Sequence, residues 1–378
     1  MTAFGKFQLV EQIGGGRLSQ VFRVTRVGTG GGCEPRIALK RVQPVVIGEP
    51  AFVQLVVREA GLLARLDHPY LCRCHEVGVV DGCAFLTLDL VEGCTLRALL
   101  RRMSRLEVKL PTTAVVAIGY QLAMVLSYLH QDCSSPLAHL DLSPQNVMID
   151  QDGALKLIDF GIARYLDGRN PPPLGGKIAG TVGYMSPEQA RGQNAGRRAD
   201  QFGIGVLLWE MLTGRRAFRG NTPETWQRMR AGEIPQLKRS LKDVPPGLAA
   251  AVIRLLRPGT VHRFASMRDL IRQLETTTSD PLSGTRPLSA LVHRLLGDTS
   301  FDPFDVVPRE VPAMEPTDDI PCGGDRVEGY AELSIEVDHG EGSPASLVRA
   351  AVTGEVDLPD SPFLETIPEA HATAQIAR

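Results

Sequence analysis

Hydrophobic and polar positions alternate in the first part of the chain, which predicts a sheet of strands joined by hairpins. The segments Phe7–Ile13, Val21–Arg26 and Ile37–Val42 alternate with a period of two, and glycine-rich stretches separate them. Residues Phe52–Leu66 instead carry apolar side chains at helical spacing. We therefore expect a small β-rich lobe with one helix over about residues 7–88.

After the next strand, Phe85–Val91, the pattern becomes helical. Thr112–His130 and Ala199–Thr213 are long apolar stretches that predict two core helices of a larger lobe. Between them, two short strands are expected around residues 147–149 and 155–158. The most apolar windows fall short of about 18 residues and contain polar groups, so we expect no membrane-spanning helix.

From about residue 276 the chain is rich in Pro, Gly, Ser and acidic residues and contains no Lys. Residues 280–378 hold 19 acidic and 6 basic residues, a charge of −13, whereas the preceding part carries +11. This composition predicts a largely disordered tail, with a short helix over 288–296 and a strand over 330–337. The tail is either a solvated linker or a segment that binds its own basic body or a regulatory partner.

Composition excludes several classes of protein. The hydrophobic fraction of 43% and the charged fraction of 22% are typical of a globular protein. The seven Cys lack the paired spacing of a zinc site or disulfide framework, which favours a reducing cytoplasm. Aromatic residues make up only 5% of the chain and the Arg residues are scattered, so we expect no nucleic-acid partner. The N-terminus shows no signal peptide, and no membrane partner is expected.

Two features near the N-terminus suit phosphate binding. A glycine cluster, Gly14–Gly16, lies between two predicted strands, where backbone N–H groups can approach an anion, although a plain hairpin turn gives the same pattern. Lys40 sits in the apolar run Ile37–Lys40, where a buried ammonium needs an anionic partner unless it reaches solvent at a sheet edge. Glu59, on the predicted helix, can supply that charge.

Two acidic motifs suit hydroxyl activation and cation binding. In the segment His139–Asn146, Asp141 and Asn146 lie five residues apart on a predicted loop, so both can face one cavity. Asp141 can accept or orient a hydroxyl proton, and the Asn146 amide oxygen can bind Mg²⁺. Asp159, in Asp159-Phe-Gly161 directly after a strand, can bind the same cation. An Asx turn explains either motif when it is taken alone.

A further segment, Gly180–Glu188, is followed by Asp200 on a core helix and by Arg263. A buried Glu needs a cationic partner, so Glu188 and Arg263 are expected to pair.

In this order and at this spacing, the motifs resemble those of the protein kinase family. The resemblance covers residues 7–275 and is strongest to the bacterial eukaryotic-like (Hanks-type) serine/threonine kinases, through Ser143–Val147 and Gly180–Gln189. It implies an α+β, two-lobed kinase fold with an N-lobe over 7–88, a hinge over 89–93 and a C-lobe over 94–275, followed by the acidic tail 276–378.

The resemblance also implies an activity, transfer of the γ-phosphate of ATP, with Mg²⁺, to Ser or Thr hydroxyls of protein substrates. The implied catalytic residues are Lys40, Glu59, Asp141, Asn146, Asp159 and Thr181, with Asn146 and Asp159 as Mg²⁺ ligands. The implied nucleotide-binding residues are Ile13, Gly14, Gly15, Gly16, Ser19, Val21, Ala38, Lys40, Leu88, Asp89, Val91 and Met148. In addition, Asp200 is implied to brace the catalytic loop, and Thr181 to favour Ser/Thr acceptors.

Three residues depart from the family pattern. Ser19 replaces a loop glycine, Ser143 replaces a catalytic-loop Lys, and Leu140 replaces the Arg that usually pairs with a phosphorylated activation loop. The loop over residues 162–180 also contains no Ser and no Thr. We therefore expect activity that does not require Ser/Thr phosphorylation of this loop.

Two alternatives remain open at this stage. A pseudokinase scaffold would bind ATP with little phosphotransfer, which the departures favour. A small-molecule phosphotransferase would share the Asp and Asn sites, but the segment Gly180–Glu188 and its partner Arg263 argue against it.

Overall fold

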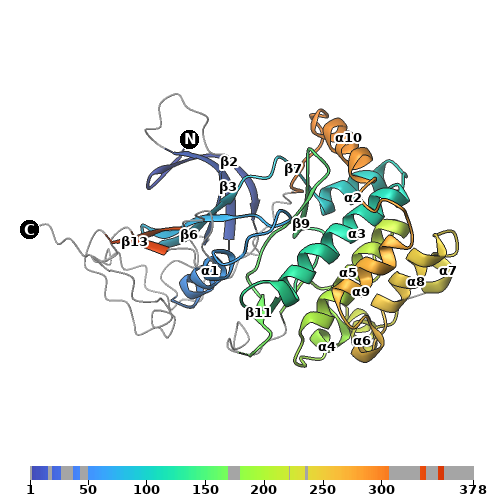
Figure 1. Ribbon diagram of the computed structural model, residues 1–378. Helices are drawn as coiled ribbons and strands as arrows, with labels where there is room; N and C mark the ends of the chain where they lie inside the picture. Colours follow the sequence, from blue (N-terminus) through green and yellow to red (C-terminus); the bar gives the residue numbers. More distant parts are fainter. Residues whose placement is uncertain are drawn as a thin grey trace, which may run out of the picture.

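The computed structural model describes residues 2–15, 19–26, 37–42, 50–168, 179–220, 222–234, 237–305, 333–337 and 348–352 (Figure 1). For residues 50–55, 57, 333–337 and 348–352, only the backbone is described. The predicted two-lobed α+β fold is confirmed, with a curved sheet on one side and a helical body on the other.

The N-lobe is built on an antiparallel sheet with the strand order β1-β2-β3-β4-β6-β5-β12-β13. Its strands are β1 (Thr2–Phe4), β2 (Phe7–Gly15), β3 (Ser19–Arg26), β4 (Ile37–Val42), β5 (Cys74–Val80), β6 (Cys83–Asp89), β12 (Leu333–Val337) and β13 (Val348–Val352). The helix α1 (Pro50–Leu63) packs on β4, β5 and β6. The alternating pattern predicted these strands because every second residue, such as Phe7 and Leu9, points into the core.

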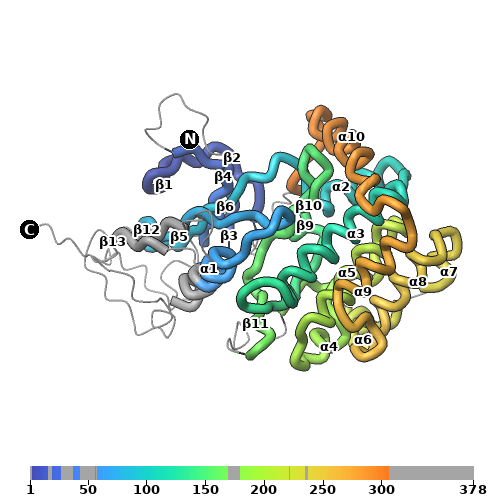
Figure 2. Tube along the Cα trace, viewed as in Figure 1, coloured from blue at the N-terminus to red at the C-terminus, as the bar shows by residue number. Residues whose placement is uncertain are grey.

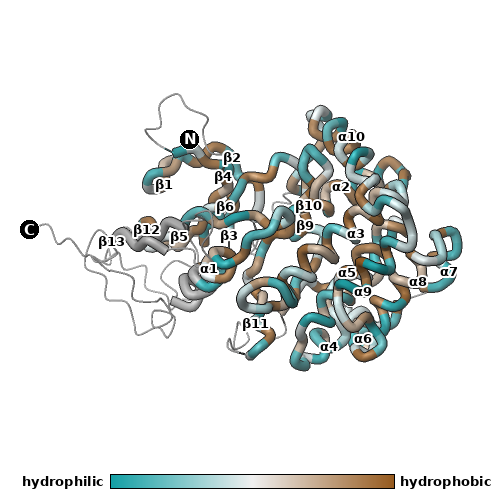
Figure 3. The backbone as a smooth tube through the Cα atoms, viewed as in Figure 1, coloured by the Kyte–Doolittle hydropathy of each residue, from teal (hydrophilic) through white to brown (hydrophobic). Residues whose placement is uncertain are grey.

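Two helices, α3 (Thr112–Ser127) and α5 (Arg197–Thr213), form the centre of the C-lobe, where hydrophobic positions concentrate (Figure 3). Around them lie α2 (Leu96–Arg105), α4 (Pro187–Ala190), α6 (Pro223–Ala231), α7 (Leu237–Ser240), α8 (Pro246–Leu255), α9 (Met267–Glu275) and α10 (Thr285–Leu296). Short strands complete the lobe: β7 (Gly93–Thr95), β8 (Leu137–Ala138), β9 (Val147–Asp150), β10 (Leu155–Leu157) and β11 (Arg164–Tyr165).

The helix that begins as α3 is longer than the sequence pattern predicted. It continues through a π-helical turn to Asp132, and its 21 residues have a mean hydropathy of 1.5 over the most apolar window. By length and composition it is therefore able to cross a membrane, and our expectation that no stretch reaches that length was wrong. However, 72% of this window is buried inside the protein, where α3 packs against α5, α9 and α10, as expected of a core helix.

The segment after α9 packs onto the C-lobe and runs back toward the N-lobe (Figure 2). The helix α10 covers the region for which the sequence predicts a helix, and it buries Leu288, Val292 and Leu295. Close packing explains the glycine that precedes it, because a Cβ on Gly284 would lie 2.1 Å from the Thr113 carbonyl oxygen. The predicted strand over 330–337 contains β12, whereas most of the remaining tail lies outside the described residues.

The Glu188–Arg263 pair predicted from the sequence is present and buried. Two parallel bonds of 2.7 and 2.9 Å join the guanidinium to the carboxylate, and Arg263 is only 1% exposed. Arg263 also donates to the carbonyl oxygens of Arg257, Arg198 and Pro258, so its remaining N–H groups are satisfied. This arrangement fixes the loop before α9 to the start of α4.

Replacing Glu188 by Ala should strongly destabilise the C-lobe, because it leaves the Arg263 charge buried and unpaired. We expect a loss of about 3–5 kcal/mol in the free energy of unfolding, measured by urea denaturation. Asp132→Ala is a matched control, because it removes an exposed pair with Arg268 at 2.6 Å that contributes about 0–1 kcal/mol. Similar losses for the two variants would contradict this account.

Candidate active site

The predicted catalytic side chains come together where the sheet meets the C-lobe. Lys40 comes from β4 and Glu59 from α1, and Asp159 lies two residues after the end of β10. The loop between β8 and β9 contributes Asp141 and Asn146. The site is thus assembled from segments more than a hundred residues apart in the sequence.

Lys40 is held by two carboxylates. Its Nζ lies 2.9 and 2.8 Å from the two oxygens of Glu59 and 3.2 Å from Oδ1 of Asp159. Burial alone would lower the pKa of Lys40, but the charges of Asp159 and Glu59 outweigh burial and raise it. Burial would likewise raise the pKa of Asp159, but the Lys40 ammonium and the Gly161 N–H lower it. The contacts between Lys40 and the two carboxylates, together with the Gly161 N–H, therefore favour the charged forms of Lys40 and Asp159.

Glu59 also orders the segment that follows Asp159. Its Oε1 accepts a hydrogen bond of 3.2 Å from the Phe160 N–H, and the Phe160 ring packs edge-to-face on His139 with centroids 4.8 Å apart. Asp159 has a φ of +66°, an uncommon conformation for a residue with a side chain. The bonds to Lys40 and to the Gly161 N–H hold it in this conformation.

The carboxylate of Asp141, which is predicted to be catalytic, is held by two donors. Its Oδ1 accepts from the Thr181 N–H at 2.7 Å, and its Oδ2 accepts from the Asn146 side-chain amide at 2.9 Å. Burial, together with the neighbouring negative charge of Asp159, raises the pKa of Asp141. A carboxylate in such surroundings is a better proton acceptor than an exposed aspartate.

Asp200, on α5, organises the backbone before Asp141. Its two oxygens accept from the N–H groups of His139 and Leu140, at 3.0 and 2.7 Å, and its Oδ2 lies 2.7 Å from His130 Nε2. Leu140 has a φ of +66°, and its carbonyl oxygen accepts from the Gln189 side chain at 2.8 Å. The buried Asp200 carboxylate therefore holds a turn that the chain would otherwise avoid.

The residues predicted to bind Mg²⁺ have suitable oxygen donors. Asn146 donates its Nδ2 hydrogens to the carbonyl and carboxylate oxygens of Asp141, which leaves the amide oxygen as the atom able to face a cation. The Asp159 side chain is 43% exposed and favoured in its charged form. An amide oxygen and a carboxylate are the ligands that a hard cation such as Mg²⁺ prefers.

The predicted nucleotide-binding residues lie on β2, β3, β4, β6 and β9 and on the chain after β6. Those described are Ile13, Gly14, Gly15, Ser19, Val21, Ala38, Leu88, Asp89, Val91 and Met148, whereas Gly16 lies outside the described residues. Val91 and Met148 form a small buried cluster with Cys72, against which Ile158 and Phe304 pack. Sequence reasoning missed Cys72, Ile158 and Phe304, because an apolar residue outside a motif resembles any core residue.

A family comparison agrees with this geometry. Residues 7–275 match the model of the protein kinase domain. The chain belongs to the protein kinase family.

Several curated bacterial kinases are similar to this chain. The tyrosine-protein kinase MasK of Myxococcus xanthus is 30% identical over 82% of this chain and 49% of its own length. The serine/threonine-protein kinase PknH of Mycobacterium tuberculosis is 32% identical over 74% of this chain and 43% of its own. The serine/threonine-protein kinase PrkC of Bacillus subtilis is 28% identical over 72% of this chain and 40% of its own length. The chain thus spans half or less of the length of these relatives.

Two residues, Leu140 and Ser143, are buried and uncharged where the kinase family usually has Arg and Lys. Leu140 is buried in a small apolar cluster with Ala138 and Ala199, against which Ile162 and Ala195 pack. Ser143 is fully buried, and its hydroxyl has no hydrogen-bond partner in the part of the chain that the structure describes. It therefore does not replace the positive charge of the family's usual Lys.

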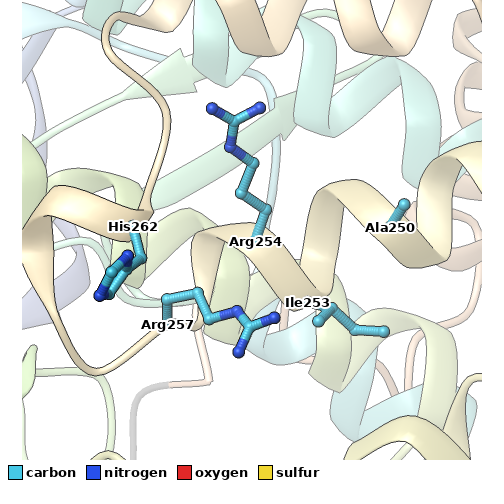
Figure 4. Close-up of a pocket in the computed structure, with 5 residues that line it drawn as sticks. All are labelled: Ala250, Ile253, Arg254, Arg257 and His262. Carbon is cyan, nitrogen blue, oxygen red and sulfur yellow. The ribbon is translucent and has the colours of Figure 1, made fainter.

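A separate pocket lies at the end of α8 and contains none of the predicted nucleotide-binding residues (Figure 4). Its lining includes Arg254, Arg257 and His262. The Arg254 guanidinium stacks over Phe264 at 4.4 Å, and the Arg257 carbonyl oxygen accepts from Arg263. Arg257 thereby helps to hold the buried Arg263, so residues that line the pocket have a role in the packing of the C-lobe.

Asp200→Asn tests whether the carboxylate supports the catalytic loop. An amide has one acceptor oxygen instead of two, so at least one buried N–H loses its partner. We expect a loss of about 1–3 kcal/mol in the free energy of unfolding, measured by urea denaturation. The exposed Asp243→Asn is the control and should change stability by no more than about 0.5 kcal/mol. Equal stabilities of both variants and the parent would refute the bracing role.

Proposed function

We propose that this protein is a serine/threonine kinase that transfers the γ-phosphate of Mg·ATP to hydroxyl groups of protein substrates. The observation that carries the proposal is the joint geometry of Lys40 and Asp141. Lys40 is paired with Glu59 and Asp159, and Asp141 is held separately by Thr181 and Asn146. The Lys40 ammonium is thereby fixed for binding the phosphates, and the Asp141 carboxylate for binding the substrate hydroxyl.

In the proposed reaction, Lys40 binds the α- and β-phosphates and Glu59 keeps its ammonium in place. Bound Mg²⁺, held by Asp159 and Asn146, supplies charge neutralisation for the phosphates. Asp141 accepts a hydrogen bond from the substrate hydroxyl and orients its oxygen for in-line attack. Its raised pKa suits it to take the proton as the hydroxyl oxygen bonds to the γ-phosphorus, while the bond from that phosphorus to the bridging oxygen breaks and ADP leaves.

Ser/Thr acceptors are favoured by Thr181, because the kinase resemblance places it beside the peptide site, and its backbone N–H binds Asp141. Relatives named serine/threonine-protein kinase also support this choice, whereas one relative is named a tyrosine-protein kinase. Tyrosine transfer is therefore the second candidate, and Ser143 favours it because the Lys typical of Ser/Thr kinases is missing. Phosphoamino-acid analysis of the product separates the two.

We also propose that activity does not require phosphorylation of Ser or Thr in the activation loop. Most regulated kinases have an Arg at the position of Leu140, and that Arg holds a phosphate on the activation loop. In this chain, Leu140 instead packs against Ile162 at the start of that loop. Residues 169–178 of the loop lie outside the described residues, and residues 162–180 contain no Ser or Thr. Apolar packing thus substitutes for the charge pair.

The proposed setting is the cytoplasm, which suits the five described cysteines, all of them buried and none joined in a disulfide within the described residues. The acidic tail is proposed to bind its own kinase domain. In support, Asp298 contacts Arg102, and Asp305 contacts Arg97 and Arg101.

Asp141→Ala should lower incorporation of radiolabelled phosphate from ATP by about 10²–10⁴-fold, because the hydroxyl loses its proton acceptor. Asp152→Ala, which changes an exposed turn between β9 and β10, is the matched control and should retain the parent rate. Equal incorporation by the parent and Asp141→Ala would exclude the kinase proposal and favour a scaffold. Phosphate on tyrosine alone would favour the second candidate.

Phosphatase-treated protein should keep its phosphotransfer rate, because Leu140 packs without a phosphate. The rate is measured before and after treatment on an added peptide, with mock-treated protein as the control. Mass spectrometry verifies that residues 162–180 carry no phosphate. A collapse after treatment, reversed by phosphorylation of Tyr165, which carries the side-chain hydroxyl of this range, would disprove independence from loop phosphorylation.

A further inference from the structure

The chain after α10 is anchored beside the hinge. Asp298 pairs with Arg102, and the Pro303 carbonyl oxygen accepts from the Thr95 N–H at 2.8 Å. Asp305 pairs with Arg97 at 2.9 Å and also contacts Arg101. All of these partners lie on α2 or on Thr95, the N-cap that begins it directly after the hinge. The segment 298–305 is therefore fixed to the C-lobe side of the hinge.

A tight turn directs Phe304 between these anchors. Oδ1 of Asp302 accepts from the N–H groups of Phe304 and Asp305, both at 3.0 Å. Asp305 has a φ of +52°, a conformation that Asp tolerates better than most residues. Phe304 then packs against the cluster of Cys72, Val91 and Met148, together with Ile158.

This cluster contains Val91 and Met148, two of the residues that the kinase resemblance implies bind the nucleotide, and there they would contact the adenine. Val91 lies in the hinge, two residues after the end of β6. Met148, on β9, is expected to contact one face of the adenine ring. A purine binds where apolar and aromatic side chains cover its faces and edges. Phe304 therefore adds an aromatic side chain, from a segment outside the family's matched region of residues 7–275, to the base end of the proposed site.

We propose that Phe304 is a nucleotide-binding residue, which closes the base end of the ATP site from the segment 298–305. The inference rests on the proposed function, because it assumes that adenine binds beside Val91 and Met148. The anchors place the segment at the outer edge of the hinge. At the other end of the site, the Lys40 side chain is 13% exposed and that of Asp159 43% exposed, so the phosphate end remains accessible.

Phe304→Ala in the full chain should raise the Kd of both Mg·ATP and Mg·ADP by about five- to tenfold, measured by isothermal titration calorimetry. The increase should be equal for the two nucleotides, because the lost contact is to the base. Phe304→Tyr keeps the ring and should retain the parent affinity. Phe301→Ala is the matched control, because Phe301 belongs to the same segment but packs on the main core, and its Kd should change less than twofold.

Three results would overturn the inference. An unchanged Kd for Phe304→Ala would make the contact mere surface packing. A lower Kd would make the segment an inhibitor that competes with ATP. An equal increase for Phe301→Ala would assign the effect to the stability of the segment. Thermal denaturation of each variant checks that it is folded. Failure of the proposed function is distinct, because a scaffold would still bind both nucleotides but would show equal phosphate incorporation by the parent and Asp141→Ala.

Discussion

The structure of the site depends on one interaction, the pairing of a buried ammonium with two carboxylates from different parts of the fold. Lys40 lies on the sheet, Glu59 on the helix that packs on the sheet, and Asp159 on the C-lobe side. Each charge would be costly to bury alone, so each element must lie where it meets the other two. Because Glu59 also binds the Phe160 N–H, the same interaction sets the backbone that presents Asp159.

Much of the site was predictable because burial of charge requires a partner. The position of Lys40 in an apolar strand and of Glu59 on the following helix predicted that the two would pair. In the structure, Lys40 Nζ lies 2.8 Å from Glu59 Oε2. The same argument predicted the buried pair Glu188–Arg263. Local motifs were also informative, because Asp141 and Asn146 are close in the sequence and share one loop. The periodicity of hydrophobic residues indicated the two lobes and the helices α1, α3, α5 and α10.

The remaining features depend on contacts that no local pattern contains. Phe304 meets Val91 across more than two hundred residues, and nothing near either residue indicates the other. The apolar cluster around Leu140 was also hidden, since the sequence showed only that an Arg was missing. The core helix ends two residues beyond the predicted His130, because a π-helical turn extends it to Asp132 and a period of 3.6 residues does not predict such a turn.

The pairing of β12 with β5 has a consequence for the order of events during synthesis. Ile335 lies opposite Val77 in this register, so the final neighbour of β5 is made after about 250 intervening residues. At a ribosomal rate of about 5–20 residues per second, that delay is roughly 10–50 s. Throughout this interval β5 is an open sheet edge, with unpaired backbone groups able to pair with another nascent chain. Protection of the β5 edge by β12 therefore begins only after about 260 further residues have been made.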